Sequence, residues 1–444
     1  MENLTINFSP EERKYLTIYK EIKKRILKGS LQKDEKLPSK RALGKNLGVS
    51  VNTVCSGYDL LLQEGYIYSR EKSGYFVAES YAPSPEKESA YEEKEKSYRW
   101  DFTSAKVDQA SFPSFTFKKI INNLLMNQPD ILMNKSPYQG DLRLRSSIAR
   151  YLLENKGIEV DIESIVIVSS LEESLSVVAS LISPESLGIE NPGYHRILRF
   201  FSRKCAIDYL PMDEEGAAVP QKPYSLVYLT PYNQFPTGVK MSSRRKKAIA
   251  QSPCRYIFED DFDCDLISRK GYVSTIYSLN TDKVFYYGTF THTIGPGIRI
   301  GYLLLPSGME KRYRQIYRYS SSRISSLDQG FIGIFLREGY YYRHIGKIKR
   351  INAKKKETIR KVLDRCPFLS YRENELSFLV RFKRSLPLPI LKERLEKAGI
   401  KIDFIGDFSK KKEDSRLILF FSAISEDRIE IAVKSLTDFL ETLL

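Results

Sequence analysis

Short apolar runs recur through the chain from about residue 100 onward, and amphipathic stretches separate them. Continuous apolar runs are typical of strands that are buried on both faces, and amphipathic stretches are typical of the helices that cover such strands. The alternation therefore predicts an α/β fold with a largely parallel sheet between two helical layers. We expect strands at Ile165–Val168, Leu187–Ile189, Leu226–Leu229, Tyr256–Phe258 and Val284–Tyr287.

The last of these runs leads into the stretch YGTFTHTIGPGIRIGY, residues 287–302. We expect the strand to end at Gly288 and a polar loop, rich in Gly and Pro, to follow. The hydroxyls of Thr289 and Thr291 and the guanidinium of Arg299 are groups that suit a compact anion. Ligands of parallel sheets gather at the carboxyl ends of strands, so this loop is a candidate binding site.

The composition limits the class of protein. A chain of 444 residues is long enough for two or three domains. Its formal net charge of +16 favours a polyanionic partner such as DNA. Five scattered cysteines and three histidines predict no metal site and a reduced compartment. The charged N-terminus and the lack of a run of about 18 apolar residues predict a cytoplasmic protein with no membrane span.

The first seventy-eight residues have the pattern of three helices and a hairpin. Apolar residues at helical spacing, followed by Gly, predict helices at Glu11–Lys28, Ser39–Leu47 and Val51–Glu64. Ser50 is a natural N-cap for the third helix. The alternation over Tyr66–Val77 predicts a hairpin, so the segment is expected to form a winged helix-turn-helix.

The segment LPSKRALGKNLGVSVNTVCSGYDLLLQEGYIYSREKSGYFV resembles the DNA-binding module of GntR-family regulators. The resemblance implies that the third helix enters the major groove of double-stranded operator DNA while the wing holds phosphates. An alternative reading is that Ser50 and Thr53 only cap their helix. The residues that the resemblance implies as DNA contacts are Ser39, Lys40, Arg41, Ser50, Asn52, Thr53, Lys72 and Gly74.

The segment ESYAPSPEKESAYEEKEKSYR is charged, poor in apolar groups and broken by two prolines, which is typical of a flexible connector. We therefore expect a DNA-binding domain at residues 1–78, a linker at 79–99, and an effector-binding and dimerisation domain at 100–444.

Several motifs of the large domain resemble those of fold-type I aminotransferase domains, in the form that MocR/GabR-type regulators carry. They are SPYQGDLRLRSSIARYL, ENPGYHR, TPYNQFPTG, EDDFDCDL and the 287–302 stretch. The resemblance implies a homodimer that is head-to-tail and domain-swapped, and a transcriptional regulator that senses a ligand in its aminotransferase-like domain.

The family's cofactor, pyridoxal phosphate (PLP), is expected to be lost. The lysine that forms the imine is replaced by His292, which has no primary amine. A tyrosine is replaced by Phe262, and in the phosphate cup a glycine and a glutamine are replaced by Ser170 and Glu172. Asp260, which pairs with the pyridinium nitrogen in the family, is kept, and so is Arg299, which matches a phosphate ligand of the family. We expect no catalytic residue, no covalent PLP and no PLP binding.

Two alternatives stay open, a PLP-dependent aminotransferase and a regulator that binds PLP non-covalently through Asp260 and Arg299. The main expectation is a small anionic ligand whose strongest contact is Arg416, by resemblance to the arginine that clamps a carboxylate. The alternatives for single residues are that Arg416 only pairs with a nearby acid and that His292 is merely hydrogen-bonded. The predicted ligand-binding residues are Tyr194, Arg196, Asn233, Asp260, Phe262, Thr289, Thr291, His292, Arg299 and Arg416.

The segment Arg343–Lys361 holds nine Lys and Arg against one Glu. Such a run is typical of a solvated helix face, and in a DNA complex it would also suit the phosphate backbone. On the second reading, replacing Lys354, Lys355 and Lys356 by Glu flattens the salt dependence of DNA binding.

Overall fold

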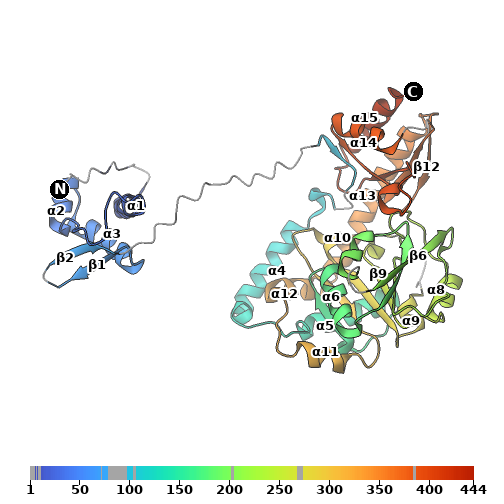
Figure 1. Cartoon of the computed structure of the whole chain (residues 1–444), viewed down its shortest axis with the longest axis horizontal. Helices are drawn as coiled ribbons and strands as arrows, with labels where there is room; N and C mark the ends of the chain where they lie inside the picture. Colours follow the sequence, from blue (N-terminus) through green and yellow to red (C-terminus); the bar gives the residue numbers. More distant parts are fainter. Residues whose placement is uncertain are drawn as a thin grey trace. The chain divides into compact units, whose positions relative to one another are not determined.

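The computed structural model describes residues 6, 8, 12–71, 73–78, 98–103, 107–201, 205–267, 274–383 and 387–444. The chain divides into two compact units, Met1–Lys96 and Ser97–Leu444 (Figure 1). The linker predicted at residues 79–99 lies outside the described residues except for Tyr98 and Arg99. None of the described helices is long and apolar enough to cross a membrane.

The first unit is a winged helix-turn-helix, as predicted. Its buried apolar side chains, among them Ile18, Val54 and Leu61, form one core that joins the helices to the wing. The second helix ends at Gly48, whose φ of 64° is a left-handed conformation that favours glycine. Its elements are α1 Lys14–Leu27, α2 Lys40–Leu47, α3 Val51–Gln63, β1 Ile67–Arg70 and β2 Gly74–Val77.

The second unit is built on a large sheet, in which the described residues form eight strands in the order β4-β11-β10-β9-β8-β5-β6-β7. Neighbouring strands from β10 to β6 are parallel. At the two edges, β7 pairs antiparallel with β6, and β11 pairs antiparallel with both β10 and β4. The expected largely parallel sheet is thus confirmed. The strands are β4 Ile165–Val168, β5 Ser186–Asn191, β6 Ala206–Asp213, β7 Gly216–Ala217, β8 Leu226–Leu229, β9 Ile257–Asp261, β10 Val284–Thr289 and β11 Gly301–Leu304.

Helices cover both faces of this sheet, because successive strand residues belong to different apolar clusters. In β9, Ile257 packs with the cluster of α5 and α12, whereas Phe258 packs with the cluster of α6 and α7. The neighbours Asp260 and Asp261 consequently point to opposite faces. The helices of this part are α4 Ser114–Asn127, α5 Leu142–Lys156, α6 Leu171–Ile182, α7 Leu198–Phe201, α8 Ser243–Ala250, α9 Ile276–Leu279, α10 Thr291–Ile294, α11 Glu310–Tyr317 and α12 Ser326–Arg337.

The expected end of the strand at Gly288 is wrong, because β10 continues to Thr289 and a short helix, α10, follows the next residue. A Cβ at residue 288 would lie 2.4 Å from the ring of Tyr302 on the neighbouring strand β11. Glycine therefore serves here to admit the tyrosine ring, and it does not break the strand.

A smaller antiparallel sheet with the order β12-β13-β16-β15 forms the C-terminal part of the second unit. Trp100 and Phe102, from the start of the unit, are buried in its core, and β3 pairs with β14. The elements are β3 Trp100–Asp101, α13 Tyr340–Leu363, β12 Leu369–Glu373, β13 Ser377–Phe382, α14 Leu388–Lys397, β14 Ile400–Lys401, β15 Asp403–Phe404, β16 Leu417–Phe420 and α15 Ile429–Glu441.

Candidate functional site

The predicted DNA-binding residues gather at the first turns of α2 and α3. Ser39 caps α2 by accepting from the backbone N–H of Ala42 at 3.2 Å, and Ser50 caps α3 by accepting from that of Thr53 at 3.1 Å. Arg41 and the residues Ser50 and Asn52 are exposed, whereas Thr53 is half-buried. The remaining N–H groups of each helix start can bind a phosphate, so capping and DNA contact are compatible.

Lys40 and the wing residues differ in how accessible they are. The Lys40 ammonium lies 4.9 Å from the centre of the Tyr75 ring and 3.7 Å from Asp59, and the hydrogen bond to Tyr75 raises the pKa of Lys40. Its charge is thus partly used within the domain. Gly74 opens β2 with a φ of 114°, a left-handed conformation. Lys72 lies outside the described residues.

The ligand-binding residues predicted in the large domain, with the exception of Arg416, line one cavity of about 500 Å³. The cavity opens at the carboxyl ends of β8, β9 and β10 and at the start of α6, where parallel sheets hold their ligands. The residues brought together there are Tyr194, Arg196, Asn233, Asp260, Phe262, Thr289, Thr291, His292 and Arg299.

Asp260 is deeply buried in this cavity, with 3% of the residue exposed. The Tyr228 hydroxyl donates to its Oδ2, while its Oδ1 accepts no hydrogen bond from the described residues. Burial raises the pKa of Asp260 to about 8, against the hydrogen bond from Tyr228 and with the charges of Asp261 and Asp263 adding to the rise.

His292 faces the cavity from α10. Its ring packs edge-on against Phe262, with 5.7 Å between the ring centres, and its Nδ1 lies 3.4 Å from Oδ1 of Asp263. Desolvation lowers the pKa of His292, but the contact with Asp263 and the charge of Asp260 outweigh it, so the pKa is raised. The raised pKa favours an imidazolium ion beside the Asp263 carboxylate.

The start of α6 is where the resemblance implies a phosphate cup, and the donors of Ser169 there are in use. The Glu173 carboxylate accepts from both the N–H and the hydroxyl of Ser169, each at 2.7 Å, and Ser170 caps the helix by accepting from the N–H of Glu173. Glu172 also lines the cavity. Two carboxylates therefore stand where a phosphate would need donors.

The position of Arg416 differs from the prediction. It is absent from the residues that line the cavity, and its guanidinium forms a fork with Asp414, with Nε 3.0 Å from each carboxylate oxygen and Nη2 2.5 Å from Oδ2. The structure therefore does not place this arginine at the cavity, and the alternative of a nearby acid describes its contacts. The acid lies two residues away in the sequence.

Other cavity residues were missed. Asp263 is the second residue after β9, in the EDDFDCDL motif, so its position was a signal for it. Asp403 had no such signal; burial raises its pKa to about 6. The further lining residues include Ser169, Tyr228, Thr230, Gln234, Tyr287, Phe408 and Phe420.

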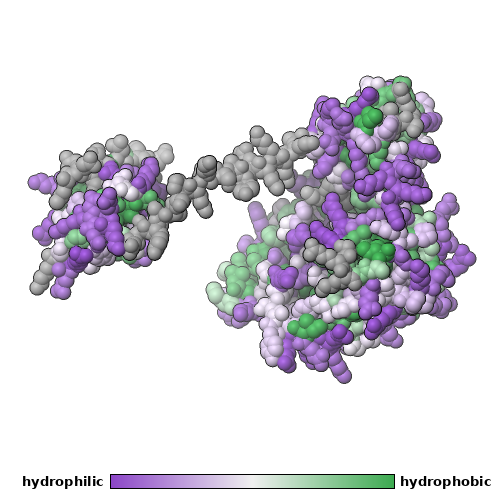
Figure 2. All heavy atoms as spheres, in the orientation of Figure 1, coloured by the Kyte–Doolittle hydropathy of each residue, from purple (hydrophilic) through white to green (hydrophobic). Residues whose placement is uncertain are grey.

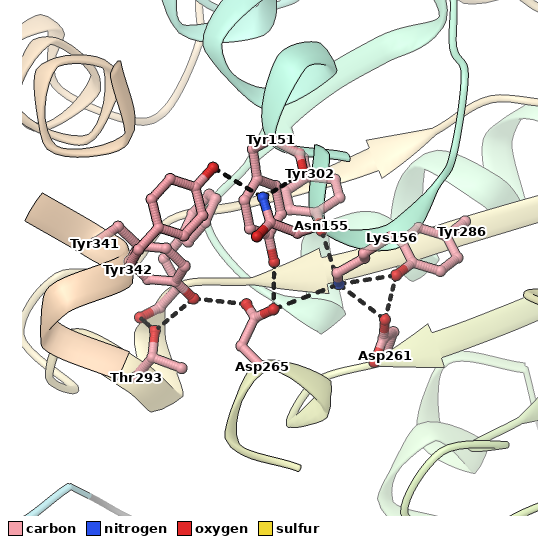
Figure 3. Close-up of polar contacts among 11 residues, drawn as sticks. Tyr151, Asn155, Lys156, Asp261, Asp265, Tyr286, Thr293, Tyr302, Tyr341 and Tyr342 are labelled. Carbon is pink, nitrogen blue, oxygen red and sulfur yellow. Dashed lines mark hydrogen bonds and ion pairs between the residues drawn. The ribbon is translucent and has the colours of Figure 1, made fainter. Parts of the chain in front are cut away.

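A buried polar network lies behind the cavity, on the face of β9 to which Asp261 points. Lys156, from the end of α5, lies 2.9 Å from Asp261 and 3.9 Å from Asp265, and 3.0 Å from the Tyr286 hydroxyl. Figure 3 shows its ammonium between the two carboxylates. The network holds the end of β9, and with it Asp260, from behind.

The same network reaches the turn that carries His292. Tyr341 of α13 donates to Asp265 at 2.6 Å, and its hydroxyl lies 3.2 Å from that of Thr293, the residue after His292 (Figure 3). His344 lies 2.7 Å from the carbonyl oxygen of Thr293. Through Asp265 and Thr293, α13 thus contacts both the segment that follows β9 and the turn that carries His292.

The basic segment of α13 is less free than its sequence implies. Lys355 is buried and pairs with Asp108 at 3.2 Å, and Lys356 lies 3.0 Å from Glu373. Lys354 pairs with Glu426 at 3.2 Å. A triple replacement of these lysines by Glu would therefore disturb packing, and it is not a clean test of DNA contact.

The first unit matches a known family, and the whole chain is similar to known regulators. Residues 14–77 match the family of bacterial regulatory proteins, gntR family. The whole chain is 29% identical to the uncharacterized HTH-type transcriptional regulator YdeL of Bacillus subtilis, over 95% of this chain and 96% of that protein. It is 26% identical to the probable rhizopine catabolism regulatory protein MocR of Rhizobium meliloti, over 94% and 92%.

The larger unit has the fold of aminotransferases. An archaeal alanine:glyoxylate aminotransferase superposes with a TM-score of 0.70 at 21% identity, covering 78% of this chain and 91% of that one. The fold class expected from the sequence, a winged helix-turn-helix joined to a fold-type I aminotransferase-like domain, is thus confirmed.

Proposed function

We propose that this chain, whose relatives are GntR-type transcriptional regulators of the MocR kind, binds operator DNA under the control of a small ligand. The first turns of α2 and α3 bind the DNA, and the cavity of the aminotransferase-like domain binds the ligand without imine chemistry. Ligand binding shifts the population of DNA-binding conformations. Such a regulator acts in the cytoplasm.

The observation that carries the non-enzymatic reading is His292 on α10. An imine needs a primary amine, and no lysine is among the described residues that line the cavity. The buried Lys156 lies behind β9, where Asp261 and Asp265 hold it. The aminotransferase-like domain therefore serves in this proposal as a receptor.

We propose that PLP is not the ligand of this cavity, on the following features. The second oxygen of Asp260 suits a ring nitrogen, which is the one feature that favours a non-covalent PLP site. The donors of Ser169 are taken by Glu173, and Glu172 would repel a phosphate beside it. We therefore propose a regulator that works without PLP.

We also propose that the chain acts as a head-to-tail homodimer with swapped DNA-binding domains. Aminotransferase-like folds are commonly dimeric. Phe115, Met126 and Met133 are each 82% exposed, and Figure 2 shows apolar surface over α4. An exposed apolar patch of this kind is typical of a protein interface. Sedimentation of the wild type and of a Met126→Glu variant tests the assembly.

The test of the DNA proposal uses the full chain. Sites occupied in cells are mapped first, and their DNA is then titrated by fluorescence anisotropy. Asn52→Ala, at the start of α3, is expected to weaken specific binding by about 1–3 kcal/mol if it contacts a base. Gln63→Ala, at the exposed end of the same helix, is the matched control. Equal affinities of both variants and the wild type would reject this contact.

The test of the cofactor proposal is the visible spectrum after PLP is added, followed by borohydride. No imine band and no reduced adduct are expected. An adduct on any lysine of the large domain would overturn the proposal.

A further inference from the structure

The exposed face of α13, up to Lys356, carries only cations and small residues. The exposed residues of this stretch are Arg343, Gly346, Lys347, Arg350, Ala353 and Lys354. Residues 340–356 include no Asp or Glu. Positions three and four residues apart share one face of a helix, so Arg343, Lys347 and Arg350 form one row. We call these three residues the basic row.

The basic row has no acid to pair with. None of its three cations forms an ion pair with a carboxylate in the part of the chain that the structure describes. Like charges at this spacing repel one another, which destabilises a helix. The later part of α13 differs, because each of its cations pairs with an acid; these cations are Lys354, Lys355, Lys356, Arg360 and Lys361. The charge of the basic row is therefore the charge of α13 that stays available to a partner.

The surface around the basic row is open and partly held in place. The Arg343 guanidinium lies over the ring of Tyr340, 4.8 Å from its centre. The exposed Lys119 of α4 donates to the Tyr340 hydroxyl at 3.2 Å and so adds a fourth cation beside the row. A Cβ built on Gly346 would meet no atom within 4 Å, so no other described residue covers the helix at this point.

The chemistry of this face indicates the kind of partner. Protein interfaces have large apolar side chains at their centre, and none is exposed on α13 among the described residues. Duplex DNA carries about one negative charge per 1.7 Å of its axis. The basic row extends from residue 343 to residue 350, which at about 1.5 Å per residue is about 10 Å, so it can face several phosphates.

We propose that the basic row binds the phosphate backbone of DNA, as a second contact besides that of the winged helix. This inference rests on the proposed function, because the winged helix brings the DNA to the chain. Phosphate contacts carry charge but no sequence information, so the row adds affinity without adding specificity.

The test is the salt dependence of DNA binding by the full chain, measured by fluorescence anisotropy on a site mapped in cells. Each phosphate contact releases counterions and adds about 0.9 to the slope of log affinity against log salt. The variant Arg343→Gln/Lys347→Gln/Arg350→Gln should therefore flatten the slope by about 2.7. Between about 50 and 200 mM salt, the wild type should lose about 40-fold more affinity than this variant.

The matched control removes the same charge from other exposed lysines. Lys222→Gln/Lys397→Gln/Lys434→Gln replaces lysines that already pair with acids on the surface, and its slope should equal that of the wild type. Lys347→Gln alone should flatten the slope by about 0.9, which keeps the test decisive if the triple variant does not fold. Duplexes with the same site and unrelated flanks should show the same loss.

A basic-row variant with the slope of the wild type, as expected if the row binds an acidic protein, would overturn the inference. So would a control variant that flattens the slope equally, because total charge would then explain the effect. The proposed function fails separately, if the wild type shows no preference for the mapped site over unrelated DNA. If that preference exists and Asn52→Ala weakens it while the basic-row variant changes nothing, only the inference fails.

Discussion

Lys156→Met is the sharpest test of the network behind the cavity. The side chain of Lys156 is 2% exposed and that of its partner Asp261 is 0% exposed. Removing one member of a buried ion pair costs about 3–5 kcal/mol, because the other charge loses its compensation. An unfolding entropy of about 2.1 cal/mol/K per residue gives about 0.7 kcal/mol/K for residues 97–444, so the thermal midpoint should fall by about 4–7 °C.

The double variant Lys156→Met/Asp261→Asn removes both charges and keeps a polar group opposite Tyr286. We expect it to recover most of the lost stability, since replacing both members of a buried pair is often nearly neutral. Lys222→Met is the matched control, because Lys222 makes a similarly short contact, 2.7 Å against 2.9 Å, with Asp208 on the surface. An exposed pair contributes about 0–1 kcal/mol, so this variant should lower the midpoint by at most about 1.5 °C.

The assay is thermal unfolding of the full chain, followed by circular dichroism and by the fluorescence of Trp100, the single tryptophan, which is buried in the C-terminal core. A midpoint for Lys156→Met within about 2 °C of the wild type would refute the reasoning. So would a double variant that is no more stable than the single one.

Three further predictions follow from other groups. Ser50→Ala should destabilise the isolated DNA-binding domain by about 1 kcal/mol through the lost cap, and Ser50→Thr should not; equal urea midpoints would count against the cap. Burial raises the pKa of Glu190 from 4.5 to about 7, so the folded chain holds a proton that the unfolded chain releases, and stability falls as pH rises through this window. Glu190→Gln should therefore gain about 3 kcal/mol relative to the wild type between pH 4.5 and 8, and a pH-independent difference in unfolding free energy would contradict this. Arg416→Met should leave ligand affinity unchanged, because Asp414 already holds the guanidinium; a tenfold loss in calorimetry would return Arg416 to the site.

Much of the fold was predictable because its signals are local. Ser39 and Ser50 cap their helices through contacts three residues away, and Gly48 ends α2 through its own backbone angle. The apolar runs at Ile165–Val168 and Leu226–Leu229 are strands with those bounds. Gly288 was misread because its neighbour, the Tyr302 ring, comes from the adjacent strand.

The residues that line the candidate cavity likewise divide into those that the sequence predicted and those that it did not. The motifs that resemble aminotransferase loops identified most of its lining, because these loops all follow strand ends and the strand ends meet. Asp403 and Tyr228 were missed, since neither belongs to a recognisable loop motif. The use of Ser169 by Glu173 depends on side-chain positions that no motif encodes.

The sequence by itself determined the winged helix, the alternation of strands and helices, and the histidine that stands in place of an amine. Only the tertiary structure decided which charges are available: Lys355 is engaged by Asp108, whereas Asp260 and Asp263 keep oxygens without donors among the described residues. The physical reason is the sequence separation over which each kind of interaction acts. Caps and periodicity act within a few residues, but the burial and pairing of a charge depend on segments that only folding brings together.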